Sequence, residues 1–229
     1  MSPVGAIALW SLSFIGSHLV ISSPWVRRRL VARIGELPYR VVYSIVAFAT
    51  LTALIITFAH HKHSGTLIWY LRDIAPIRWL VWLTMLSALI LLVAGLINPS
   101  PSTLGASPNA AAAGVLKLTR HPSFVAFIMF GVAHMLMNGW AGDLIFFGTF
   151  PVLSIIGGMH QDRRKQDELG DRYRQFVART SFVPGAALWS GREHWTAADM
   201  PWAAIAIGVV ATILIVLAHP YLFGGSPIG

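Results

Sequence analysis

The chain contains no cysteine, and only 11% of its 229 residues carry a charge. The absence of cysteine excludes thiol catalysis, thiolate metal ligands and disulfides. A soluble globular domain has about 25% charged residues, so this chain has too little charge to cover a surface exposed to water. Soluble enzymes, disordered chains and disulfide scaffolds are therefore excluded. Since hydrophobic residues make up 55% of the sequence, it predicts an integral membrane protein.

Long stretches free of Asp, Glu, Lys and Arg mark the predicted membrane spans. A spanning helix needs about 20 mostly apolar residues. We expect six such helices, near 4–22, 39–59, 78–97, 122–138, 144–160 and 201–219. The segment 98–114 contains Asn-Pro and Ser-Pro pairs, which predict a loop. The fold class is therefore predicted as all-α, a polytopic membrane bundle that forms a single domain over residues 1–229.

The first predicted helix has no basic residue before it, so we interpret it as a retained span and not as a signal peptide. The predicted loops after the first, third and fifth helices together hold 14 of the 17 lysines and arginines. By the positive-inside rule these loops face the cytoplasm, and both termini lie outside. We expect the net charge of +8 to attract anionic membrane lipid and not nucleic acid.

The last of these loops contains a charged segment that predicts a further helix, near 162–178. Its apolar residues Leu169, Tyr173, Phe176 and Val177 follow the i, i+4, i+7, i+8 spacing. This spacing forms an apolar stripe on one face of a helix. We expect an amphipathic cytoplasmic helix that lies against the membrane or the bundle.

Histidines are the main candidates for chemistry. Five lie near or inside predicted spans, and these are His18, His121, His134, His160 and His219. Each imidazole can ligate a metal or haem iron, or it can bond a neighbouring carbonyl as a neutral polar group. Both interpretations stay open, and His18 and His134, which lie inside spans, favour ligation most. The His60–His63 cluster stands in a loop whose one carboxylate is Asp73, and we interpret it as a solvated interfacial loop.

The sequence also resembles a known family. The resemblance rests on an ordered set of short motifs: Gly114, Thr119-Arg120-His121-Pro122, His134, Asn138-Gly139, Asp162-Arg163, Gly170, Tyr173, Thr180-Ser181, Pro184, Gly191-Arg192 and the ending Ala218–Gly224. This set resembles the NnrU family across the whole chain. The resemblance implies a multi-pass protein of the bacterial inner membrane that is linked to nitric oxide and nitrite metabolism. The family also includes haem-dependent zeta-carotene isomerases.

That resemblance implies a site and a cofactor. It implies haem b with His18 and His134 as the axial metal ligands, and either nitric oxide or an apolar polyene such as zeta-carotene as the ligand or substrate. Arg120, His121 and Arg163 are further candidates for cofactor binding, since an arginine can hold a haem propionate, a lipid headgroup or another carboxylate. An ordinary arginine facing the cytoplasm is the alternative for Arg120.

Helix direction conflicts with this pair of ligands. The predicted first and fourth helices run in opposite directions, so His18 lies near an inner end and His134 near an outer end. Pairing by depth favours His134 with His219, or His18 with His121. We keep the pair that the resemblance implies, and the alternatives stay open.

Two other functions stay open. Arg120-His121-Pro122 at a helix start, together with Leu169-Gly170, is similar to membrane methyltransferases that act on a lipid or prenylated group. That similarity implies S-adenosylmethionine near His121 and Asp162, although Gln161-Asp162 replaces the paired acids of those enzymes. A haem-based sensor or an assembly factor is the third hypothesis. The sequence alone does not decide whether the protein is an enzyme.

Overall fold

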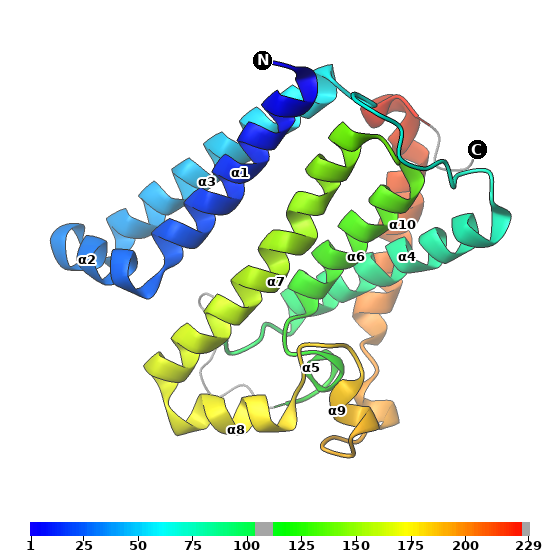
Figure 1. Ribbon diagram of the computed structural model, residues 1–229. Coiled ribbons are helices and arrows are strands. Elements are labelled where there is room, and N and C mark those ends of the chain that lie inside the picture. The colour runs from blue at the N-terminus through cyan, green and yellow to red at the C-terminus, as the bar shows by residue number, and fades with distance from the viewer. Residues whose placement is uncertain (104–111, 226–229) are drawn as a thin grey trace. The chain divides into compact units, whose positions relative to one another are not determined.

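The described part of the chain is helical in a computed structural model, which covers residues 1–103 and 112–225 (Figure 1). The helices are α1 (Pro3–Ser22), α2 (Pro24–Ile34), α3 (Glu36–His60), α4 (Ala75–Ile97), α5 (Val115–Leu118), α6 (Pro122–Met137), α7 (Ala141–Leu169), α8 (Asp171–Arg179), α9 (Ala186–Trp189) and α10 (Trp202–Phe223). A 3₁₀ turn covers Ala197–Asp199. The all-α prediction is confirmed. Residues 104–111 of the predicted loop lie outside the described residues.

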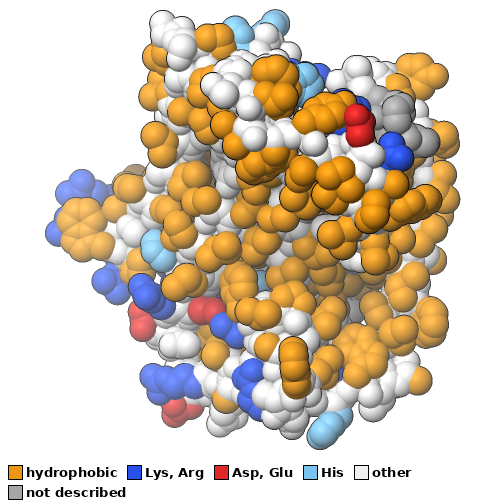
Figure 2. All heavy atoms as spheres, turned by 45° about the vertical axis from the view of Figure 1, so that its right-hand side comes forward, with side chains coloured by type: hydrophobic (Ala, Val, Ile, Leu, Met, Phe, Trp, Pro, Cys, Tyr) orange, Lys and Arg blue, Asp and Glu red, His pale blue; other side chains and the backbone are white. Residues whose placement is uncertain are grey.

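Five helices in the described part are long and apolar enough to cross a membrane: α1, α3, α4, α7 and α10. The remaining predicted span is α6, whose 16 residues extend about 24 Å. This length is less than the roughly 30 Å of a bilayer's hydrocarbon core. Figure 2 shows hydrophobic side chains over most of the face in view. These features indicate a multi-pass membrane protein, while six spans and outward termini stay predictions.

Two helix boundaries differ from the predictions. The basic segment after the first span, expected as a loop, contains α2, which begins with Pro24 in its first turn after the N-cap Ser23. Proline suits this position because the first turn needs no N–H donor. The helix expected near 162–178 is divided between the end of α7 and α8. Gly170, with φ +60°, separates them, because glycine adopts this left-handed conformation readily.

The chain folds into two compact units. The first contains residues 1–81 and 131–164, and the second contains residues 82–130 and 165–229. Helices α4, α6 and α7 each supply residues to both units. The single domain over 1–229 stays a prediction.

In the first unit, α1 and α3 lie antiparallel, and α2 joins them at one end (Figure 1). The Tyr39 hydroxyl of α3 donates a hydrogen bond of 3.1 Å to the Ile21 carbonyl of α1. Further along the pair, Ile7 and Leu54 are completely buried. Burying such side chains contributes roughly 1.5–3 kcal/mol each.

Helices α6 and α7 approach each other closely within the same unit. A Cβ atom at Gly131 would overlap the Pro151 ring and the Phe147 carbonyl. In a regular helix the Phe147 carbonyl would accept a hydrogen bond from the N–H of residue 151. Pro151 has no N–H, so this carbonyl lacks its usual donor. The close contact therefore requires glycine at position 131.

The second unit has a continuous apolar core. Its buried members come from α4, α6, α8 and α10 and the segment before α6, and include Leu91, Val115, Val125, Tyr173, Phe176 and Ala204. The burial of Tyr173 and Phe176 confirms that α8 presents an apolar stripe. Gly208 of α10 packs directly on Ile90 of α4. Small residues of this kind let membrane helices pack closely.

Asp199 connects the segment before α10 to α5. Its carboxylate accepts a hydrogen bond of 2.9 Å from the Lys117 ammonium and others from Thr196 and the Gly114 N–H. The bond from Lys117, followed by those from Thr196, holds the pKa of Asp199 well below its usual range. These bonds outweigh the effect of burial, which alone would raise the pKa.

We expect Asp199→Asn to lower the free energy of unfolding at pH 7 by about 1–3 kcal/mol, since it removes a charged acceptor. A depressed carboxyl pKa stabilises the fold above the unfolded-state pKa of about 4, and this contribution is lost as the pH falls through the folded-state value. In thermal unfolding in detergent, the difference in unfolding midpoint between the variant and wild type should therefore become smaller below about pH 4. Asp167→Asn, on an exposed site of α7, is the control. Equal effects of the two variants at pH 7 would contradict this assignment.

Candidate functional site

The motif Thr119-Arg120-His121-Pro122 lies in the second unit, where it is bound to the segment around residues 180–185. The Thr119 hydroxyl donates a hydrogen bond of 2.8 Å to the Phe182 carbonyl. The Arg120 N–H donates to the Ser181 carbonyl, and the Gly185 N–H to the Leu118 carbonyl, both at 2.8 Å. Two motifs about 60 residues apart in the sequence are thereby held together.

Arg192 also binds this segment. Its guanidinium donates hydrogen bonds to the Thr180 carbonyl at 2.9 Å and the Ala178 carbonyl at 3.1 Å. The Thr180 and Ser181 side chains bond backbone groups of their own segment. The motif residues of this unit therefore satisfy backbone groups that would otherwise be costly to bury.

His121 is buried within this arrangement. Only 3% of the residue is exposed, and its ring lies 5.1 Å from the Phe182 ring and 5.5 Å from the Phe124 ring, between centroids. Its backbone N–H donates to the Thr119 hydroxyl at 3.2 Å. The aromatic contacts give His121 a packing role, and its neighbour Arg120 belongs to the same unit.

His18 lies in the first unit, near the end of α1. Its Nδ1 is 3.0 Å from the Phe14 carbonyl. A carbonyl only accepts, so Nδ1 carries the proton and the lone pair is on Nε2. The ring packs edge-on to Phe14 and Tyr43, with centroids 4.4 Å and 5.4 Å away. These contacts fix the tautomer and the orientation, as the outer contacts of metal-ligating histidines do.

His134 also lies in the first unit, near the end of α6. Its ring stacks on Phe147 of α7 with centroids 4.6 Å apart. Phe147 in turn contacts Phe58, close to the end of α3. His134 is therefore associated with the C-terminal end of α3, while His18 contacts Tyr43 near the beginning of that helix.

The structure does not bring His18 and His134 together. His18 contacts Tyr43 of α3 directly. His134 is linked to Phe58, 15 residues further along α3, indirectly through Phe147. This separation corresponds to about 22 Å of helix. Two axial ligands of one haem iron must approach that iron from either side at bonding distance. The pairing of His18 with His134 as axial ligands of one haem stays a prediction.

Arg163 is exposed on α7. The next residue, Arg164, lies close enough to the Tyr39 and Tyr43 hydroxyls to interact electrostatically with both. Among the described residues, no group of three or more His, Asp or Glu side chains is arranged to hold a metal ion.

One contact was missed by the sequence interpretation. His63, which was expected in a solvated loop with Asp73 as its carboxylate, binds Asp143 at the start of α7. The His63 N–H donates to Asp143 Oδ1 at 3.1 Å, and its Nδ1 is 2.7 Å from Oδ2. The Asp143 side chain is fully buried. The sequence does contain a signal for this contact: Asp143 is an acid without a local partner at the start of an apolar helix.

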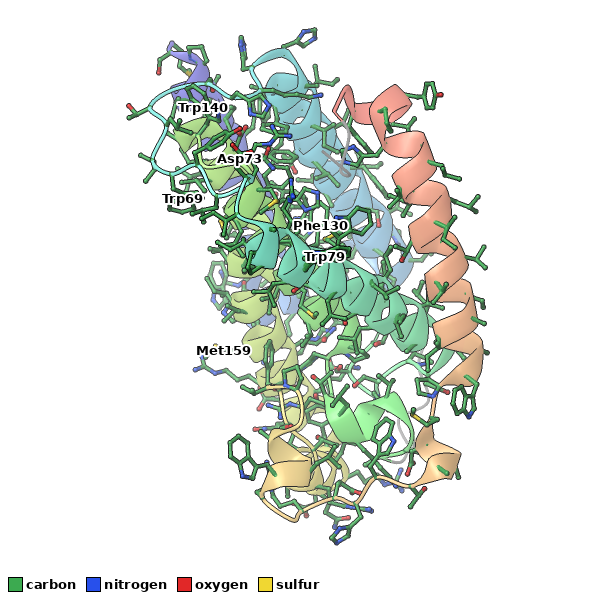
Figure 3. The ribbon with its side chains drawn as sticks, turned by 90° about the vertical axis from the view of Figure 1, so that its right-hand side faces the viewer. Trp69, Asp73, Trp79, Phe130, Trp140 and Met159 are labelled. Carbon is green, nitrogen blue, oxygen red and sulfur yellow. The ribbon has the colours of Figure 1, made fainter. Side chains whose placement is uncertain are left out.

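The adjoining loop closes over this end of the first unit. The Trp69 indole N–H donates to the Met135 carbonyl at 3.0 Å, and the Ile68 N–H donates to the Gly139 carbonyl at 2.7 Å. Figure 3 shows Trp69, Asp73 and Trp140 toward one end of the view and Met159 well away from them. The His134 end of the unit is thus covered by a hydrogen-bonded loop.

An open, shallow groove of about 460 Å³ lies on one exposed face of α3. It is lined by Arg40, Val41, Ser44, Ile45 and Phe48. The groove is mostly apolar, with a cation at one end.

Residues 6–227 match the family model described as NnrU protein. The chain belongs to the NnrU family. The match covers both units, including the bound motifs of the second and the histidine-bearing helices of the first.

Two curated relatives are similar to this NnrU protein. One is the 15-cis-zeta-carotene isomerase, chloroplastic, of Zea mays, with 26% identity over 84% of this chain and 54% of the relative. The enzyme of the same name from Arabidopsis thaliana has 25% identity with the same coverage. The chain spans about half the length of these relatives. No solved structure is significantly similar to it.

We expect Asp143→Asn to destabilise the NnrU protein by about 1–3 kcal/mol, because the buried carboxylate loses its charge-assisted bond to His63. Thermal unfolding in detergent measures this loss. Asp73→Asn, in the exposed loop, is the control and should leave the unfolding midpoint unchanged. Equal midpoints for the two variants would show that the His63–Asp143 contact contributes nothing.

Proposed function

We propose that this NnrU protein catalyses the cis–trans isomerisation of a polyene dissolved in the membrane, such as a 15-cis carotene. The observation that carries the proposal is the similarity to two 15-cis-zeta-carotene isomerases across 84% of this chain. The apolar helices support it, because such a substrate partitions into lipid and reaches a membrane-embedded site without crossing water. The groove on α3 offers an apolar surface open to such a molecule.

We propose haem b as the cofactor, with His18 as one ligand. When bound, reduced haem iron supplies an interaction with the polyene that lowers the barrier to rotation about the double bond. The Nδ1–H of His18 donates to the Phe14 carbonyl and leaves Nε2 as the ligand atom. Phe14 and Tyr43 hold the ring in place, so little conformational freedom is lost on ligation.

The surroundings of His18 support a bound group with negative charge. Arg164 lies near the tyrosines of α3, and Arg27 lies over the Tyr39 ring at 5.7 Å. Arg27 already pairs with Glu36 at 3.0 Å. Cations of this kind can also pair with a carboxylate like a haem propionate. Arg163, the neighbour suggested by the sequence, is exposed, and Arg120 belongs to the other unit.

We propose the bacterial cytoplasmic membrane as the location, with the basic loops on the cytoplasmic side. The uneven distribution of Lys and Arg supports this orientation. The following test separates this proposal from three other functions. These are a link to nitric oxide or nitrite metabolism, methyl transfer, and haem sensing.

The test is isomerisation of a 15-cis carotene by the purified protein in liposomes, with haem supplied and reduced by dithionite. We expect conversion to the trans isomer, measured by chromatography, and a reduced absorption spectrum with separate alpha and beta bands. His18→Ala should lose haem and reduce conversion to background. His219→Ala is the control, because among the described residues the His219 ring contacts only the Gly225 carbonyl just after α10 and the Phe223 ring.

Haem without conversion would contradict the isomerase and favour a sensor, which a spectral response to nitric oxide would then support. A colourless protein that binds S-adenosylmethionine would favour methyl transfer. Full activity of His18→Ala would contradict the role given to His18.

A further inference from the structure

We propose that α2 binds the headgroup of an anionic phospholipid, with Arg28, Arg29 and Arg33 as the residues that pair with its phosphate. This surface lies on a different helix from His18 and His134. It depends on neither haem nor a polyene, so its test and the test of the proposed function give independent results.

Helix α2 lies at the level where two membrane-spanning helices end. It contacts both α1 and α3 and joins them at one end of the first unit (Figure 1). Both neighbours are long and apolar enough to cross a membrane. A helix that joins two adjacent spans lies just outside the hydrocarbon core, at the level of the lipid headgroups. Trp25, which is 58% exposed, is of a residue type enriched at this level.

Helix α2 has a basic side and an apolar side. At 3.6 residues per turn, the three arginines of the proposed site fall within an arc of about 140°. Leu30, Val31 and Ile34 fall on the opposite side. None of the residues of α2 is buried within the protein. A helix of this kind lies along the membrane surface, with its apolar side toward the lipid chains and its basic side toward the phosphates.

The three arginines of the basic side have no acidic partner among the described residues. Residues 23–40 hold five arginines and one acid, Glu36. That acid is already used, because Arg27 binds both of its oxygens at 3.0 Å and Arg40 binds one of them at 2.9 Å. The positive charge on the basic side of α2 is therefore available to an anion from outside the protein.

The long basic segment after the apolar part of α7 differs in this respect. Residues 162–179 hold six basic and four acidic residues. Three of the basic side chains form ion pairs, which join Lys165 to Glu168, Arg174 to Asp171 and Arg179 to Glu193. Charge that can bind an external anion is thus concentrated on α2, which the net charge of the whole chain does not reveal.

The basic side of α2 is also preorganised for an anion. The Arg29 guanidinium lies over the Trp25 ring, 3.7 Å from its centroid. This cation–π contact restricts Arg29 before a ligand arrives, so less entropy is lost on binding. Arg29 and Arg33 are four residues apart, and like charges at this spacing repel each other. A phosphate between them removes the repulsion and accepts bidentate hydrogen bonds from guanidinium groups.

The surroundings of these arginines favour an anionic phospholipid over other phosphates. Phosphatidylcholine carries a cation beside its phosphate, which the unpaired arginines repel, whereas phosphatidylglycerol has the phosphate without that cation. Basic residues clustered on an amphipathic helix are typical of sites for anionic lipid. The apolar side of α2 gives a lipid chain a contact that a free phosphate cannot use.

The test is titration of the detergent-purified protein with phosphatidylglycerol or phosphatidylcholine, with bound lipids counted by native mass spectrometry. We expect wild type to bind phosphatidylglycerol in preference to phosphatidylcholine. Arg29→Gln/Arg33→Gln should lower the affinity for phosphatidylglycerol by roughly tenfold or more. Arg172→Gln/Arg174→Gln removes the same charge from exposed positions of α8 and should leave this affinity unchanged.

A further variant, Trp25→Leu, separates a defined site from a general effect of charge. It keeps every arginine and removes the ring under Arg29, so it should lower the affinity for phosphatidylglycerol severalfold. Equal losses in the α2 and α8 double variants, or equal binding of the two lipids by wild type, would overturn the proposal. Binding of inorganic phosphate alone that the glutamine variant of α2 loses would assign these arginines to a soluble anion and overturn the assignment to lipid.

Discussion

The antiparallel packing of α1 and α7 against α3 determines the depth at which each polar side chain of the first unit lies. Tyr39 and Ile21 fix α1 on α3, while Phe58 and Phe146 fix α7 on it. These contacts place His18 at one end of the unit and His134 at the other. A charged or polar group is costly in a membrane unless it has a partner. The level of each histidine therefore limits what it can bind.

Much of the fold follows from the sequence. The charge-free stretches locate the long apolar helices, because a bilayer admits few unpaired charges. The spacing of Tyr173 and Phe176 predicts the buried face of α8. The bounds of α6 agree with the predicted helix near 122–138. The helix α2 and the break at Gly170 are not predicted, since they depend on local caps and tertiary packing.

The candidate site is harder to predict from the sequence. The motif around His121 identifies the family, yet its contacts with residues 180–192 show that it holds backbone segments together. Helix direction already indicates that His18 and His134 lie at different depths. The resemblance to the family directs attention to His18 and His134, and their role as ligands stays a prediction.

The central claim is that α1 and α7 both run antiparallel to α3, so that the end of α1 lies at the level of the later part of α7 and not at the level of the end of α6. Because the chain has no cysteine, spin labels can be attached at chosen exposed sites and their distances measured by pulsed electron paramagnetic resonance. Val20, Met159 and Val132 are exposed. The Val20–Met159 distance should be shorter than the Val20–Val132 distance by roughly 10 Å or more, given the axial separation along α3. Equal distances, or the reverse order, would contradict the account.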